Sequence, residues 1–456
     1  MTTTERSWAD VDPLWPPDGP LTPAISPQAL AGLAAQAFDA PAPVDTIVPG
    51  VTGVPGGLPQ AVPVAPRGGG GPIGVGSAPA PYAVHDGFDP AHLPDVRTAY
   101  DTPLFDVATL RRDFPILAEQ VHGRPLIWLD NAATTQKPRA VIERLTWFYE
   151  HENSNIHRAA HELAARATEA YEDARATVRR FVNAPREQEI AFVRGATEGI
   201  NLVAHAWGTR NLREGDEIVI THLEHHANIV PWQMVARRTG ATLQVAPVDD
   251  SGDLLMDRFA ELLGPRTRLV AVTAVSNALG TVTPLEQIVE LAHRVGARVL
   301  VDGAQSVPHL PVDLQRVPAD FFTFSGHKIF GPTGIGALYV SERVWDETPA
   351  WHGGGNMIQD VTLERSTYKS PPDIWEAGTG NIADAVGLGE ALKYVERVGI
   401  ERIAAWEHRL LEHATPRLAA VPGVRLVGTA RQKASVLSFV MAGRDPVEVG
   451  KQLDAE

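Results

Sequence analysis

We predict an α/β protein with a mostly parallel sheet in a large domain, followed by a smaller α+β domain and preceded by a disordered extension. Beyond Phe105, short runs rich in Val, Ile and Leu alternate with amphipathic stretches of helical period, which is typical of parallel strands joined by helices. Beyond Glu376 this alternation gives way to two helices, two strands and a final helix. Residues 1–100 hold 18 of the 37 prolines, and such a segment buries too little apolar surface to offset its ordering entropy.

The large domain is predicted from runs of β-branched and aromatic residues for strands, and from apolar residues three and four apart for helices. Predicted strands are Leu126–Leu129, Glu189–Val193, Glu217–Thr221, Thr242–Ala246, Leu269–Ala274, Arg298–Val301 and Phe321–Phe324. Predicted helices are Val107–Phe114, His161–Asn183, Thr197–Trp207, Pro231–Thr239, Asp257–Leu263 and Pro284–Val295. Gly and Pro clusters separate these runs.

The small domain is predicted to hold helices Ile382–Arg397, Glu401–Leu418 and Pro446–Leu453 and strands Val424–Gly428 and Ser435–Met441. The chain thus divides into a disordered extension (1–103), a large domain (104–375) and a small domain (376–456). The first helix of the large domain belongs spatially with the small domain. We see no internal repeat.

Composition excludes several classes of function. The 456 residues carry a formal charge of −15, which disfavours a nucleic-acid surface and binding to an anionic membrane. No apolar run is long enough for a transmembrane helix, and the first residues lack a secretion signal, so we predict a cytoplasmic protein. The absence of cysteine excludes disulfides and thiolate metal sites within these residues.

Lys328 is the main candidate for chemistry. It follows the apolar run Phe321–Phe324 and precedes a segment rich in Gly and Pro, so it lies at the end of a buried strand. Burial lowers the pKa of an amine and frees its lone pair for attack on a carbonyl, which is how lysines bind pyridoxal 5′-phosphate (PLP). The alternative is an ordinary lysine that ends a strand and points to water.

Other predicted strand ends carry residues suited to the same cofactor. Asp302 could pair with a protonated ring nitrogen, and Gln305 could reach the phenolic oxygen; the alternative for Asp302 is a capping role in a turn. His225 could stack on the ring and move protons, and Asn277 could bond near the phenolic oxygen. We predict no metal at His225 and His226, because neighbouring residues of an extended chain point to opposite faces.

A phosphate site is predicted where strand Glu189–Val193 leads through Gly195 into a helix. Free backbone N–H groups and the helix dipole attract anions at a helix start, and Thr197 adds a hydroxyl. The alternative is that this segment only caps the helix.

With these residues in place, the chain resembles the SufS-type (class II) cysteine desulfurases, which are fold-type I PLP enzymes of the aminotransferase class V family. The matching stretches occur in the family's order from Phe105 to Glu456. They are Trp128–Pro138, Asn155–Arg158, Phe192–Asn201, Glu224–Gln233, Val301–Ser306, Ser325–Lys328 and Glu376–Asn381.

The resemblance implies a role for each matched residue. Lys328 would hold PLP and act as the proton-transfer base, and His225 would stack on its ring. Asp302 would pair with the ring nitrogen. Gln305 and Asn277 would lie near the phenolic oxygen, and His157 and Arg158 would line the substrate side. The phosphate would be held by Ala196, Thr197, Ser325 and His327, together with Thr379 from the partner subunit of a homodimer.

Three departures from the family pattern bear on function. Ala196 stands where relatives often have a second Thr, and Gly380 replaces a frequent Pro. The family's nucleophilic Cys and its Arg for the substrate carboxylate would follow Glu456. We therefore expect the chain to be C-terminally incomplete and, as it stands, inactive as a desulfurase.

The resemblance implies conversion of L-cysteine to L-alanine, with the sulfur carried as an enzyme persulfide to an acceptor protein for sulfur mobilisation or Fe–S assembly. The alternatives are a selenocysteine or cysteine-sulfinate lyase and a non-catalytic PLP-binding cargo protein. The extension resembles those of desulfurases packaged in encapsulin shells, with Ser26–Phe38 and the segment around Trp8 and Trp15 as docking candidates. A location inside such a compartment follows from that resemblance.

Overall fold

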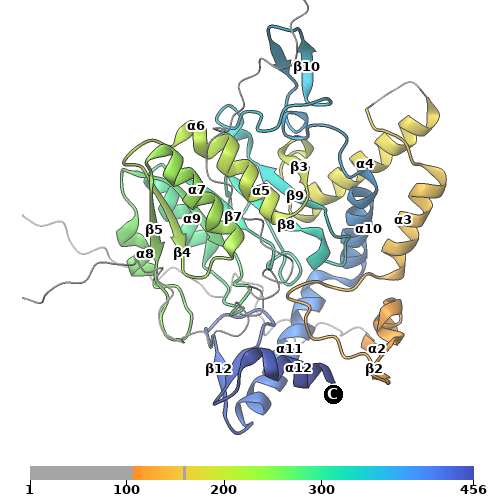
Figure 1. Cartoon of the computed structure of the whole chain (residues 1–456), viewed down its shortest axis with the longest axis vertical. Coiled ribbons are helices and arrows are strands. Elements are labelled where there is room, and N and C mark those ends of the chain that lie inside the picture. Colours follow the sequence, from red (N-terminus) through yellow and green to blue (C-terminus); the bar gives the residue numbers. More distant parts are fainter. Residues whose placement is uncertain (1–105, 158–160, 456) are drawn as a thin grey trace, which may run out of the picture. The chain divides into compact units, whose positions relative to one another are not determined.

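The computed structural model describes residues 106–157 and 161–455 (Figure 1). The predictions for the extension 1–103, including Ser26–Phe38, Trp8 and Trp15, lie outside the described residues, as does that for Arg158. No helix within the described ranges is both long and apolar enough to cross a bilayer.

In the described part of the chain, the large domain is built on a seven-stranded sheet with strand order β3-β9-β8-β7-β6-β4-β5. Neighbouring strands from β8 to β5 run parallel, whereas β9 runs antiparallel to both β3 and β8. The prediction of a mostly parallel sheet is confirmed. The strands are β3 (Ile190–Val193), β4 (Glu217–Thr221), β5 (Thr242–Ala246), β6 (Thr267–Thr273), β7 (Arg298–Asp302), β8 (Phe321–Ser325) and β9 (Gly336–Val340).

Helices cover both faces of the sheet, so its central strands are apolar on both sides. Along β3, Ile190 and Phe192 face one core with helices α4, α8, α9 and α10, while Ala191 and Val193 face the other with α5 and α7. The bounds are α4 (Glu162–Phe181), α5 (Ala196–Val203), α7 (Val230–Thr239), α8 (Met256–Leu262) and α9 (Leu285–Arg294). A π-helical turn (Ala204–Gly208) and α6 (Thr209–Asn211) follow α5.

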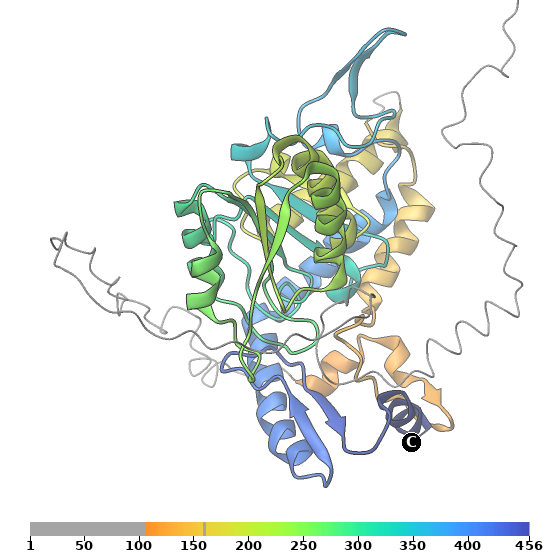
Figure 2. The ribbon, with the colours of Figure 1, turned by 60° about the vertical axis from the view of Figure 1, so that its left-hand side comes forward.

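Helix α10 (Ile382–Val398) packs against α3 (Arg139–His151) and α4, where small residues allow close approach. A Cβ on Gly389 would lie 2.9 Å from the Cβ of Ala174 on α4. The chain continues into α11 (Ile400–Ala419), the antiparallel pair β12 (Val424–Val427) and β13 (Ser438–Met441), and α12 (Pro446–Ala455). Figure 2 shows this pair beside α11.

Three predictions about elements need correction. Residues 126–130 form no strand, and Ile127 and Leu129 are 76% and 87% exposed. The only pairing near them in the described chain is the short hairpin β1 (Gln120–Val121) and β2 (Arg124–Pro125). Helix α2 (Val107–Arg111) stops before Phe114, because Pro115 disfavours helical geometry in the residue before it; a 3₁₀ turn, Pro115–Ala118, follows.

The third correction concerns the helix predicted over Thr197–Trp207, which becomes π-helical at Ala204. Several elements were not predicted from the sequence. Apart from β1, β2 and α6, these are α3, β9 and the hairpin formed by β10 (Ile358–Val361) and β11 (Ser366–Tyr368). The other predicted elements are confirmed, with shifts of a few residues at their ends.

Candidate active site

The carboxyl ends of β4, β7 and β8 bring His225, Asp302 and Lys328 together. Lys328 lies in the 3₁₀ turn Gly326–Lys328 directly after β8, and Asp302 is the last residue of β7. The charge of Asp302 acts on both Lys328 and His225, which places the three groups within electrostatic reach of one another.

The Lys328 amine is partly buried and has no polar partner within the described residues. Burial lowers its pKa, and the nearby Asp302 carboxylate opposes that shift. No hydrogen bond or ion pair from residues 106–157 or 161–455 holds its Nζ, whereas Lys393 on the surface pairs with Asp173 at 2.6 Å. A partly desolvated and unpartnered amine is what nucleophilic attack on an aldehyde requires.

Asp302 is 4% exposed and accepts one hydrogen bond, from the Ala304 N–H to its Oδ1 at 2.9 Å. Burial has the largest effect and raises the pKa of Asp302. The same backbone bond and the charges of Lys328 and His225 oppose this rise without cancelling it. No side chain in the described part of the chain donates to this carboxylate. A buried carboxylate with spare acceptor capacity fits a protonated ring nitrogen, so the residues present fit PLP.

His225 has a defined tautomer when its ring is neutral. Its Nδ1 accepts a hydrogen bond from the Ala227 N–H at 3.1 Å, so the ring proton lies on Nε2. Burial lowers the pKa of His225, and the charge of Lys328 lowers it further, against the opposing effect of Asp302. The lowered pKa favours the neutral ring, which offers Nε2–H as its one donor.

The predicted phosphate residues Thr197, Ser325 and His327 line a single cleft of about 590 Å³ at the start of α5. Gly195 precedes this helix with φ 149° and, as a glycine, has no side chain with which to cap its first N–H groups. A Cβ on Gly195 would lie 3.0 Å from Ser325 Oγ, so glycine permits the close approach. Ser325 Oγ accepts the Ala196 N–H at 2.9 Å, which commits that donor within the protein.

The remaining predicted cofactor residues lie around this centre in different ways. Gln305 is buried, and its amide donates to the Ala132 carbonyl at 2.7 Å, which leaves its own carbonyl oxygen as an acceptor. Asn277 is half-buried in the turn after β6. Thr379 is exposed and does not line the cleft in a single chain. Its contribution from a partner subunit stays a prediction.

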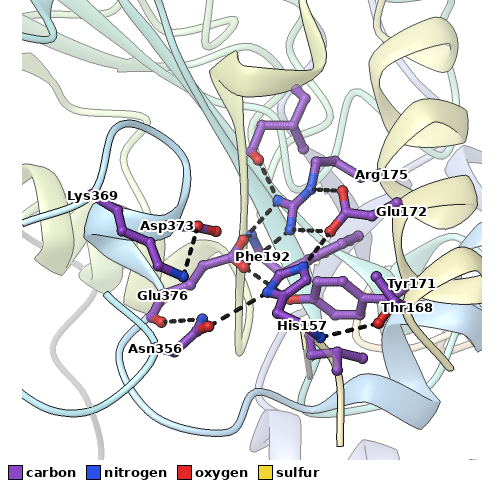
Figure 3. A network of polar contacts seen from close by, with 12 residues as sticks. His157, Thr168, Tyr171, Glu172, Arg175, Phe192, Asn356, Lys369, Asp373 and Glu376 are labelled. Atoms are coloured by element: carbon purple, nitrogen blue, oxygen red, sulfur yellow. Dashed lines mark hydrogen bonds and ion pairs between the residues drawn. The ribbon is translucent and has the colours of Figure 1, made fainter. Parts of the chain in front are cut away.

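His157 belongs to a separate polar network that sequence reasoning did not find (Figure 3). Its Nε2 lies 3.0 Å from Glu172 and its Nδ1 3.4 Å from Asn356. Glu172 bonds Arg175 on α4, and Arg175 in turn bonds the buried Glu376. The local signals in the sequence were that His157 and Glu376 each lie in a stretch matching the family, whereas Glu172, Arg175 and Asn356 lie in none. The substrate-side role of His157 stays a prediction.

No group of three or more His, Asp or Glu side chains in the described residues is arranged to hold a metal ion. The rings of His225 and His226 are 5.8 Å apart and tilted by 42°.

The fold and this site define a class: the α/β enzymes that carry a PLP cofactor. Residues 127–456 match the model of the aminotransferase class-V family, and the chain belongs to this family. The predictions of fold class and cofactor are thus confirmed at the level of the family.

Named relatives and solved structures agree with that assignment. A probable cysteine desulfurase of Mycolicibacterium paratuberculosis is 63% identical over 424 residues; the match covers 91% of this chain and 60% of the relative, so the chain spans only part of that protein's length. The cysteine desulfurase CsdA of Escherichia coli superposes with a TM-score of 0.71 at 38% identity, over 77% of this chain and 86% of that one. A C-DES variant with glycine covalently linked to its PLP cofactor gives 0.65 at 26% identity, over 75% and 90%.

Proposed function

We propose that the whole protein is a PLP-dependent cysteine desulfurase that converts L-cysteine to L-alanine and transfers the sulfur to a protein thiol. The observation that carries the proposal is the unpartnered Lys328 amine within electrostatic reach of the buried Asp302 carboxylate. The relatives named cysteine desulfurase support the choice of substrate.

Each residue would contribute one function at this site. Lys328 would bind the cofactor through Nζ and then take the α-proton of the substrate, because its lowered pKa favours the neutral amine. Asp302 would pair with the ring nitrogen, and His225 would stack and offer Nε2–H. Thr197, Ser325 and His327 would hold the phosphate. PLP, when bound, supplies an electron sink for the pair left on the α-carbon.

The sulfur step needs a thiolate, which would attack the substrate sulfur, break the C–S bond and become a persulfide while the substrate leaves as alanine. Residues 1–456 contain no cysteine, so this thiol would come from outside them. A sulfur-acceptor protein would then remove the persulfide sulfur, for Fe–S assembly or other sulfur metabolism.

The second candidate is a selenocysteine or cysteine-sulfinate lyase, whose reaction needs no thiol from residues 1–456. Selenium or sulfite can leave such substrates without transfer to a protein thiol. Alanine formation from the three substrates by the present chain distinguishes the candidates: turnover of only the selenium or sulfinate substrate would favour the second.

The cofactor proposal is tested by adding PLP to the purified protein and reducing with borohydride. We expect a visible absorbance band before reduction and a PLP-bearing Lys328 peptide after it. Lys328→Ala should lose both, whereas Lys393→Ala should keep both, because Lys393 pairs with Asp173 at the surface. A label on a different lysine would refute the assignment.

The proposed function also includes an oligomeric state, a subcellular location and a docking partner for this protein. The protein would be a cytoplasmic homodimer in which Thr379 completes the neighbouring phosphate site, and the extension 1–103 would dock it to an encapsulin shell. Sedimentation of the full chain tests the dimer. Co-purification with a shell protein, before and after deletion of 1–103, tests the docking, and retention of the shell by the deleted protein would reject it.

A further inference from the structure

The carbonyl oxygen of His327, in the peptide group that leads into Lys328, is surrounded by donors from a segment much earlier in the chain. The Thr135 N–H and Thr135 Oγ1 each lie 3.0 Å from it, and Thr134 Oγ1 lies at 3.1 Å. The Lys137 ammonium lies at 3.3 Å and also donates to the Thr135 carbonyl at 2.5 Å. Four polar groups with a proton to offer therefore lie within hydrogen-bond distance of one carbonyl oxygen.

Thr135 holds both ends of the turn that contains Lys328. Its buried hydroxyl accepts the Phe330 N–H at 2.8 Å, which leaves its own proton for the His327 carbonyl. Phe330 has φ +64°, a conformation that is costly for a bulky residue and persists only where its surroundings impose it. The bond to Thr135 is one such constraint.

Thr134 completes this arrangement through the His327 ring, since its Oγ1 lies 3.2 Å from Nδ1. A carbonyl oxygen has two lone pairs, and Thr135 and Lys137 already supply three donors to it. The Thr134 hydroxyl therefore donates to Nδ1 of His327. A neutral His327 then carries its proton on Nε2, which is free to act as a donor. Burial, and then the charges of Lys328 and Lys137, lower the pKa of His327 and favour this neutral form.

We propose that Thr135 and Lys137 are positioning residues that fix the peptide group between His327 and Lys328, and with it the direction in which the Lys328 side chain leaves the backbone. The same segment is tied to the end of β7, because Gln305 donates to the Ala132 carbonyl at 2.7 Å. It therefore joins the strand ends that carry Asp302 and Lys328. This inference rests on the proposed function, in which Lys328 binds PLP.

The test measures how fast the full-length apoprotein attaches PLP to Lys328, by borohydride quenching and mass spectrometry of the Lys328 peptide. Thr135→Val keeps the shape of the side chain and removes the hydroxyl. We expect attachment to slow by about tenfold or more, because the variant loses both hydrogen bonds of the hydroxyl. Thr135→Ser should restore the rate to within about twofold, because the hydroxyl bond returns. Lys137→Met should slow attachment as well.

Thr177→Val is the matched control, since its buried hydroxyl donates to the carbonyl of Asp173 in the same helix at 2.8 Å and not to a residue of the site. It should lower the melting temperature about as much as Thr135→Val but leave attachment unchanged. If Thr135→Val lowers the melting temperature and attaches PLP at the unaltered rate, the inference is overturned. Failure of the unaltered protein to attach PLP at Lys328 would instead overturn the proposed function.

Discussion

The carboxylate of Glu376 receives both terminal nitrogens of the Arg175 guanidinium, at 2.7 and 3.1 Å, in the interior beside β3 (Figure 3). The same carboxylate accepts the Phe192 N–H at 2.7 Å and the Tyr171 hydroxyl at 3.0 Å. It is thereby saturated with donors, which is the condition under which a buried ion pair is tolerated. Glu376 thus anchors the loop that carries Thr379 to the strand that leads into α5.

Removal of one member of this pair should be costly. Arg175→Met leaves the Glu376 charge buried without its counter-ion, and we expect the free energy of unfolding to fall by about 3–5 kcal/mol. The double variant Arg175→Met/Glu376→Gln should lose less than the sum of the two single variants, because the residual charge is gone. Urea unfolding of the full chain measures all three.

The matched control is Arg180→Met, which breaks the half-exposed pair of Arg180 with Glu396 at 2.9 Å. Exposed pairs contribute at most about 1 kcal/mol. Equal losses for Arg175→Met and Arg180→Met would contradict the assigned importance of the buried pair.

The His157–Glu172 contact should stabilise the fold in a limited range of pH. The hydrogen bond to Glu172 raises the pKa of His157 above 6.5. Burial would raise the pKa of Glu172, but the bonds from His157 and Arg175 outweigh it and lower that pKa from 4.5 to about 2. The contribution of His157 to the free energy of unfolding is fully present below pH 6.5 and is lost as the pH rises through the pKa of His157 in the folded protein. The contribution of Glu172 is fully present above pH 4.5 and is lost as the pH falls toward 2.

His157→Gln should therefore destabilise the protein more at about pH 5.5 than at about pH 8.5, by at most about 1 kcal/mol because the pair is partly exposed. Unfolding curves at the two pH values check this. His413→Gln, on the exposed side of α11, provides the control. A destabilisation by His157→Gln that does not change with pH would exclude the ion pair as its cause.

The sequence could predict the centre of the candidate site, because each of its residues lies next to a strand that is recognisable from the sequence around it. Strands β4 and β5 have the predicted bounds, since both are runs rich in β-branched residues next to turn residues. His225, Asp302 and Lys328 each follow or end a strand, and parallel strands bring their carboxyl ends to one edge of the sheet. The sheet order itself was not needed to place these residues together.

The parts that sequence reasoning missed depend on contacts between distant segments. Strand β9 begins at Gly336, which resembles a loop residue, but its missing side chain admits the Phe324 carbonyl, 2.3 Å from where a Cβ would lie. Leu126–Leu129 resembles a strand, yet no strand of the described chain pairs with it. The bonds from Thr135 and Lys137 to His327 leave no local pattern either.

Glu224 should make stability fall as pH rises. Its carboxyl group accepts bonds from Thr221 and Asn228, each at 2.6 Å, but burial dominates and raises its pKa from 4.5 to about 8. The folded chain then holds a proton that the unfolded chain releases, so this contribution is full below pH 4.5 and is lost as pH rises through about 8.

Glu224→Gln has no such proton to lose. Relative to the unaltered protein, the variant should gain stability between about pH 5 and pH 9, on the order of a few kcal/mol. Urea unfolding across this range measures the gain. Parallel curves for the two proteins would show that Glu224 is ionised throughout. Glu261→Gln, at an exposed position on α8, serves as the control.

Asp302 should set the pH at which the Lys328 amine becomes reactive. Burial lowers the pKa of Lys328 and the Asp302 carboxylate raises it, so Asp302→Asn removes the opposing effect and leaves the burial. We expect the pKa of Lys328 in the apoprotein to fall further below its usual range. Competitive acetylation with acetic anhydride, read by mass spectrometry of the Lys328 peptide, gives that pKa without the cofactor.

The Lys393 peptide from the same digest is the internal control, because its partner is Asp173. A midpoint for Lys328 that Asp302→Asn leaves unchanged would mean that the two groups do not interact, and the proposed pairing of Asp302 with the cofactor ring would lose its electrostatic support.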